Sequence, residues 1–183
     1  SPQEIRHDML IFGWDLAKLE ERKKLVILDA RPVTLTEEGY ISPTEALFKG
    51  EAIPFSHITR LIREKIAELD ARRLALDSVT VLTTQYESPF YIRQGMLGLI
   101  QALTETGCTS LLLSEAINGV LETQLEWVLV PGVMVLYYSR KGESMVRAIQ
   151  VLKMRGLKHS EDIHRMEISS KGIVVHPQER VEL

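Results

Sequence analysis

The sequence predicts an α/β fold, with a mostly parallel sheet flanked by helices and with antiparallel strands toward the carboxyl-terminal end. Two observations lead to this class. Up to about residue 115, short apolar runs alternate with amphipathic helical stretches, which is the pattern of βαβ units. After Trp127 the helical period gives way to strand patterns that are separated by the turn residues Arg140-Lys-Gly-Glu143.

Composition limits the classes of protein to consider. A chain of 183 residues can bury one substantial core, and we expect a single domain over residues 1–183. A hydrophobic fraction of 45% is ordinary for a globular protein, and a net charge of −3 gives no basic footprint for nucleic acid. The apolar run from Trp127 to Tyr138 is too short to cross a bilayer. With Cys108 as the only cysteine no internal disulfide can form, and we expect a cytoplasmic protein.

The amino-terminal residues have the chemistry of a helix start. Ser1-Pro2-Gln3-Glu4 offers an N-cap serine, a first-turn proline and a glutamate for a capping box, and Gly13 is expected to end the helix. A short charged helix from Trp14 to Lys23 and a strand from Leu25 to Ala30 should follow. The pattern from Arg31 to Phe55 is loose and is typical of an excursion or lid. Because no initiator methionine precedes the helix start, we expect the sequence to be a piece of a longer protein.

The stretch from Leu74 to Leu82 is the centre of the predicted sheet. This short apolar run suits a strand that is covered on both faces. In open α/β sheets the ligand lies outside the carboxyl ends of the strands, so Asp77 would be presented at the site. A carboxylate there can hold a magnesium ion beside nucleotide phosphates, directly or through water, as in a Walker B strand. The alternative, a strand-end aspartate that caps the next turn, stays open.

Two amphipathic helices enclose this strand along the chain. One is expected to be capped by Ser56, and the other to start at Ser88 and Pro89 with Gly107 as its stop, because their apolar residues recur on one face. A strand from Thr109 to Leu113 then ends at Ser114 and Glu115.

Later strands are expected to form an antiparallel patch that closes the parallel sheet. Side chains alternate along a strand, so Lys153 and Arg155 should share one face. Two neighbouring cations at a strand end suit a polyphosphate, and an exposed cationic strand end is the alternative. The predicted strands are Val133 to Ser139, Ser144 to Arg155, Glu167 to Ser169 and Gly172 to Val175.

Several of these segments together resemble the KaiC-like family of RecA-superfamily ATPases. The phrase Val151-Leu-Lys-Met-Arg-Gly156, followed by His159, carries the most specific part of the likeness. The resemblance implies a RecA-like fold, ATP and Mg²⁺ bound between neighbouring subunits, and a ring that is commonly a hexamer. The other matching segments are Phe12 to Leu19, Leu25 to Ala30, Asp77-Ser78, Ser114-Glu115 and Gly172 to Val175.

The resemblance also implies roles for individual residues. Asp77 would hold Mg²⁺ through water, and Ser114 and Glu115 would sense the γ-phosphate, with capping of the next turn as the alternative for that pair. A further set would contact the nucleotide of the adjacent subunit, in the manner of arginine fingers. That set comprises Lys153, Met154, Arg155, His159, Ser169 and Ser170.

Several departures from the family pattern affect these expectations. No Gly-x-x-x-x-Gly-Lys-Ser/Thr motif occurs in residues 1–183, so the family's phosphate cradle and its paired catalytic glutamates would lie upstream. Pro131 stands where the family often has aspartate, and Leu157 stands where a polar residue is common. Ser169 and Ser170 replace a common Thr-Asp pair.

These observations lead to one main hypothesis and two alternatives. We expect the carboxyl-terminal portion of a KaiC-like ATPase domain, which is inactive in the form of these residues alone. A degenerate RecA-like scaffold for interaction or assembly is the alternative. A DNA recombinase is disfavoured, because the basic surface that it needs is not visible in the sequence.

Overall fold

The computed structural model describes residues 1–29, 34–36, 39–41, 53–115 and 125–182. The chain forms two compact units, the first made of Ser1–Pro2 and Lys18–Leu125 and the second of Gln3–Ala17 and Glu126–Leu183. The single domain over residues 1–183 stays a prediction. Most of the predicted excursion from Arg31 to Phe55 lies outside the described residues. None of the helices in the described ranges has the length and apolar character needed to cross a membrane.

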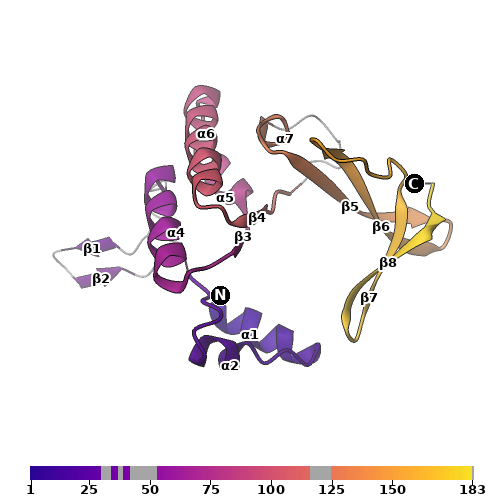
Figure 1. Cartoon of the computed structure of the whole chain (residues 1–183), viewed down its shortest axis with the longest axis horizontal. Coiled ribbons are helices and arrows are strands. Elements are labelled where there is room, and N and C mark those ends of the chain that lie inside the picture. The colour runs from indigo at the N-terminus through magenta and orange to yellow at the C-terminus, as the bar shows by residue number, and fades with distance from the viewer. Residues whose placement is uncertain (30–33, 37–38, 42–52, 116–124, 183) are drawn as a thin grey trace. The chain divides into compact units, whose positions relative to one another are not determined.

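The first unit combines helices with short strands (Figure 1). Its strands β3 and β4 pair in parallel, with Leu74 opposite Ser110 and Leu76 opposite Leu112, which confirms the predicted parallel pairing. The helix α2 crosses the boundary between the units. The elements are α2 (Leu16–Glu21), β1 (Thr34–Thr36), β2 (Gly39–Ile41), α4 (Phe55–Leu69), β3 (Arg73–Leu76), α5 (Val79–Thr83), α6 (Pro89–Glu105) and β4 (Thr109–Leu112).

Helices α4 and α6 lie side by side and bury the core of this unit (Figure 1). Both follow the predicted apolar period, since Ile58 and Ile62 of α4 and Met96 and Leu99 of α6 are buried. The α6 helix begins after Ser88 with proline in its first turn, as predicted. The α4 helix begins two residues earlier than predicted, because Pro54, with its extended backbone, serves as the N-cap in place of Ser56.

The second unit contains an antiparallel sheet of four strands in the order β5-β6-β7-β8. The β5–β6 hairpin turns at Gly142, whose φ of 62° favours glycine. Adjacent strands β6 and β7 pair only from Arg147 to Ile149, where Arg147 faces Met166. The elements are α1 (Pro2–Ile11), α7 (Leu125–Leu129), β5 (Gly132–Lys141), β6 (Ser144–Met154), β7 (His164–Ser169) and β8 (Gly172–Arg180).

Three predicted strand features are corrected by the structure. Residues Val79 to Leu82 belong to the helix α5, because the amide of Val79 donates to the carbonyl of Leu113 (2.8 Å) and the chain then turns, burying Val79 and Leu82. Residues 25–29 do not form a strand, since they pair with no strand among the described residues. Among the described residues the antiparallel strands pair in a sheet of their own, and none of them pairs with β3 or β4.

Candidate functional site

Asp77 lies at the carboxyl end of β3, directly after Leu76. On the neighbouring strand, the amide of Leu113 donates to the carbonyl of Leu76 (3.0 Å), and Ser114 follows at the same edge of the sheet. The Asp77 side chain is exposed and forms no hydrogen bond or ion pair with the other described residues. The structure places Asp77 at the carboxyl end of a strand, which is the position that the sequence predicts.

An exposed carboxylate in this position fits a magnesium site. Mg²⁺ in nucleotide sites is usually held by one or two carboxylates, by water and by substrate phosphates, so a dedicated cluster of protein ligands is not needed. The described ranges contain no group of three histidine, cysteine or carboxylate side chains placed for a metal ion. Asp77 thus fits a single-carboxylate contact, directly or through water.

Thr80 connects the two strand ends, and the sequence pattern did not single it out. Its Oγ1 accepts a hydrogen bond from the backbone amide of Glu115 at 2.8 Å. Thr80 lies on the short helix α5 that follows Asp77, so one turn of helix holds the chain that leaves β4. Ser114 and Glu115 are both exposed at this edge. Their predicted sensor role stays a prediction.

The side chains of Lys153 and Arg155 both form hydrogen bonds with the helix α7. The Lys153 ammonium donates to the carbonyl of Trp127, and the Arg155 guanidinium donates to the carbonyl of Val128 at 2.8 Å. The backbone amide of Arg155 also donates to the carbonyl of Pro131 at 2.9 Å, just beyond the end of β6. The two cations therefore lie on the same side of the strand, as the alternation of side chains predicts.

The two positive charges influence each other. Burial lowers the pKa of the Lys153 ammonium, and the nearby charge of Arg155 lowers that pKa further. An anion that approaches the pair would offset the repulsion between the two cations. This electrostatic arrangement is compatible with an anionic ligand.

The remaining predicted contacts have local partners. Met154 lies against Gly132 on the paired strand, where an added Cβ would come within 2.8 Å of the methionine sulfur. The Nδ1 atom of His159 lies 3.4 Å from the carbonyl oxygen of Leu157. Ser169 donates to the carbonyl of Gly172 at 3.0 Å, and exposed Ser170 follows it in the β7–β8 turn.

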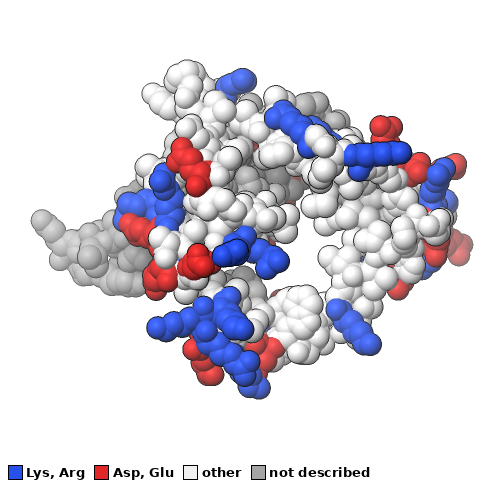
Figure 2. Space-filling view, viewed as in Figure 1, with Lys and Arg blue, Asp and Glu red and all other residues white. Residues whose placement is uncertain are grey.

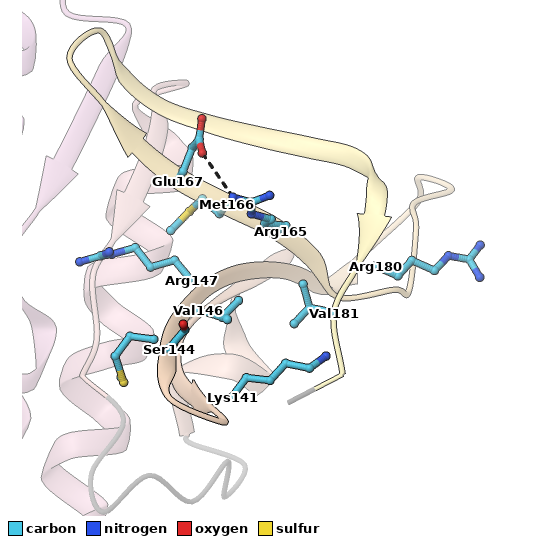
Figure 3. Close-up of a pocket in the computed structure, with 10 residues that line it drawn as sticks. Lys141, Ser144, Val146, Arg147, Arg165, Met166, Glu167, Arg180 and Val181 are labelled. Atoms are coloured by element: carbon cyan, nitrogen blue, oxygen red, sulfur yellow. Dashed lines mark ion pairs between the residues drawn. The ribbon is translucent and has the colours of Figure 1, made fainter.

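A separate hollow of about 410 Å³ lies where β6 and β7 diverge (Figure 3). Arg165, on its wall, pairs with Glu179 at 3.0 Å and with Glu167 at 3.8 Å. Arg180 pairs with Asp162 at 3.0 Å, and Figure 3 shows its side chain extending away from the other lining residues. Two of the cations that line the hollow are thus already paired with carboxylates.

Charged side chains of both signs are distributed over the two units. On the face shown in Figure 2, basic and acidic residues lie beside one another in each unit, and no continuous basic strip crosses that face. Electrostatics alone therefore does not identify a nucleic-acid surface there.

Comparisons with known proteins agree with one another. The family model of the KaiC ATPase matches residues 1–180. The circadian clock oscillator protein KaiC of Synechococcus elongatus is 31% identical over 180 residues, which cover 97% of this chain and 33% of that protein. A UPF0273 protein of Pyrococcus furiosus is 30% identical over 178 residues, which cover 96% of this chain and 70% of that protein. The chain thus spans about a third of the length of the KaiC protein that it matches.

A solved structure gives the same result for the fold. The crystal structure of a KaiC-like protein from Pyrococcus horikoshii superposes with a TM-score of 0.76 at 28% identity. The superposition covers 96% of this chain and 70% of that chain. The predicted α/β class is therefore confirmed over nearly the whole chain.

Proposed function

Because this chain belongs to the KaiC family of ATPases, we propose that it forms part of an ATP-hydrolysing domain in which Mg-ATP lies between neighbouring subunits. The observation that carries the proposal is the placement of Asp77 and of the cation pair. Asp77 lies at the carboxyl end of a parallel strand in the first unit, and Lys153 and Arg155 lie together in the second unit. In the proposed arrangement, a nucleotide between two subunits contacts Asp77 of one subunit and the cation pair of the other.

Each group has a chemical task in this proposal. Asp77 holds Mg²⁺, directly or through water, and the ion supplies charge neutralisation at the phosphates. Lys153 and Arg155 reach the phosphates of the nucleotide on the adjacent subunit, together with Met154, His159, Ser169 and Ser170. Ser114 and Glu115 lie at the same strand edge as Asp77 and respond to the γ-phosphate. The assembly that this requires is a ring, and we propose a homo-hexamer.

The chain does not supply everything that turnover needs. Residues 1–183 contain no Gly-x-x-x-x-Gly-Lys-Ser/Thr motif, so the backbone amides that cradle the phosphates are not among them. We therefore expect residues 1–183 alone to have no ATPase activity. Magnesium-dependent turnover by this chain, abolished by Asp77→Ala, would contradict that expectation.

Subunit mixing of the intact protein tests the proposal. The Asp77→Ala and Arg155→Ala variants should each lose most activity, since removal of an arginine finger typically costs on the order of 10³ in turnover. Mixed rings contain some interfaces at which an intact Asp77 faces an intact Arg155, so part of the activity should return. Lys141→Ala changes an exposed cation at the end of β5 and is the matched control, with activity close to wild type.

The outcome depends on subunit exchange, which is measured in the same mixture with two fluorescent labels. If the subunits exchange and no activity returns, both residues serve the same subunit and the proposed arrangement is wrong. If Arg155→Ala keeps wild-type turnover, the cation pair has no part in the reaction.

A further inference from the structure

The last carbonyl groups of the helix α7 accept hydrogen bonds from the cation pair. The last carbonyls of any helix have no amide partner within the helix. In α7, the amide of Val130 donates to the carbonyl of Glu126 at 3.1 Å, while the carbonyls of Trp127 and Val128 accept from Lys153 and Arg155. Cations are favourable at this end of a helix because they satisfy its carbonyls and its dipole.

The strand register places the cations at α7. Across the β5–β6 ladder, Lys153 faces Val133 and Met154 faces Gly132, and the amide of Arg155 continues the pairing with Pro131. The chain reaches β5 directly from α7, so the side chains that leave the end of β6 meet the carbonyls of the helix that precedes β5. The contact therefore follows from the hairpin itself.

The cations help to hold α7, together with the half-buried side chains of Trp127 and Leu129. A helix of five residues is not stable by its own hydrogen bonds. Val128 is 52% exposed, so burial of that side chain adds little. When the two cations leave, the last turn of α7 is expected to fray.

Phosphates compete with these carbonyls for the same donors. Hydrogen bonds from an ammonium or guanidinium group to an ionised oxygen are roughly twice as strong as those between neutral groups. A nucleotide phosphate also relieves the repulsion between the two cations, which a neutral carbonyl relieves only weakly. The side chains, however, cannot lie against α7 and extend to another subunit at the same time.

We propose that α7 is a latch for the cation pair: the carbonyls of Trp127 and Val128 hold Lys153 and Arg155 until the phosphates of a nucleotide on the neighbouring subunit take them. This inference rests on the proposed trans contact and adds its regulation. When one subunit binds a nucleotide, α7 of the adjacent subunit is released. The segment that enters β5 of that adjacent subunit thereby responds to the bound nucleotide.

Hydrogen exchange of the intact protein tests the latch, with a non-hydrolysable ATP analogue and Mg²⁺ as the probe. The amide of Val130, which closes the last turn of α7, should exchange several-fold faster when the analogue is bound. The amides of the β5–β6 ladder provide the control and should not change. Unchanged or slower exchange at Val130 would overturn the latch.

The affinity of a variant for the ATP analogue gives a second test, which does not depend on hydrogen exchange. Val128→Gly lowers the helix propensity of α7 at an exposed position, so the fold should persist. Glycine keeps the backbone carbonyl that accepts from Arg155 but disfavours the helical conformation of α7. The variant should therefore release the cations more readily and bind the analogue about two-fold more tightly. Weaker binding would show that α7 supports the cations in their bound position, which contradicts the latch.

The two proposals fail in different ways. If Arg155→Ala binds the analogue as well as the wild type does, the trans contact is wrong. If Arg155→Ala weakens binding while Val130 exchange in the wild type does not respond, the trans contact stands and only the latch is wrong. In Arg155→Ala the latch also predicts fast Val130 exchange before any nucleotide is added.

Discussion

Two glycines in one helix should respond to the same substitution with opposite signs. Gly95 and Gly98 both lie inside the helix α6. A Cβ added at Gly95 would lie 2.2–2.6 Å from three ring carbons of Phe55, whereas one added at Gly98 would meet nothing within 4 Å. Favourable carbon contacts lie at roughly 3.5–4.0 Å. The Phe55 ring stacks on Tyr86 with the ring centres 5.7 Å apart, and Tyr86 donates to the carbonyl of Ile53 at 3.1 Å, so a shift of the Phe55 ring would disturb this stacked pair.

The magnitudes follow from two opposing effects. Alanine stabilises a helix interior by about 1 kcal/mol relative to glycine. Overpacking a filled contact costs about 1–3 kcal/mol. Gly98→Ala should therefore raise the free energy of unfolding by about 1 kcal/mol, and Gly95→Ala should change it by between about 0 and −2 kcal/mol. The two variants should differ by about 1–3 kcal/mol.

Urea unfolding followed by far-ultraviolet circular dichroism measures this difference, because α4 and α6 are the longest described helices. The Phe55→Ala background provides the control, since without the ring Gly95→Ala should stabilise about as much as Gly98→Ala does. A double-mutant cycle then isolates the contact between positions 55 and 95. Equal stabilisation by Gly95→Ala and Gly98→Ala in the wild-type background would refute the packing argument.

Two further predictions concern the site and the second unit. In the intact protein, Asp77→Asn should weaken Mg²⁺-dependent ATP binding by about 10–100-fold, as loss of a water-mediated metal contact does, when binding is measured by calorimetry. Asp70→Asn, at the left-handed end of α4, is its control, and equal effects of the two variants would remove Asp77 from the site. Burial raises the pKa of Tyr137, whose hydroxyl donates to Gln150 at 2.7 Å. The unfolded chain therefore ionises first, and stability that is present below pH 10.0 is lost as the pH rises through the folded pKa. Tyr137→Phe should cost about 1 kcal/mol at neutral pH and reduce the alkaline loss, whereas Tyr138→Phe, at an exposed position, should change the stability at neutral pH little. An unchanged alkaline profile in Tyr137→Phe would contradict the assignment.

Local patterns in the sequence determined most of the elements. The apolar period of α4 and α6, the proline in the first turn of α6 and the turn residues around Gly142 each act within a few neighbouring residues. Asp77 at the end of β3 was also predictable, because an apolar run followed by a carboxylate indicates where a strand stops. The expected coverage of this strand on both faces was wrong, since Arg73 and Ala75 are exposed. The side-by-side placement of Lys153 and Arg155 followed from the alternation of side chains along a strand.

Only the tertiary structure decided how these elements pair and what the cations contact. The β-branched residues from Val79 to Leu82 favour a strand locally, but the hydrogen bond from Val79 to Leu113 ends the ladder, and burial of Val79 and Leu82 favours the helix. The partners of Lys153 and Arg155 are backbone carbonyls 26 and 27 residues away. Every residue type has a backbone carbonyl, so no sequence pattern marks those that a cation will bind, and the β5–β6 register alone brings them together.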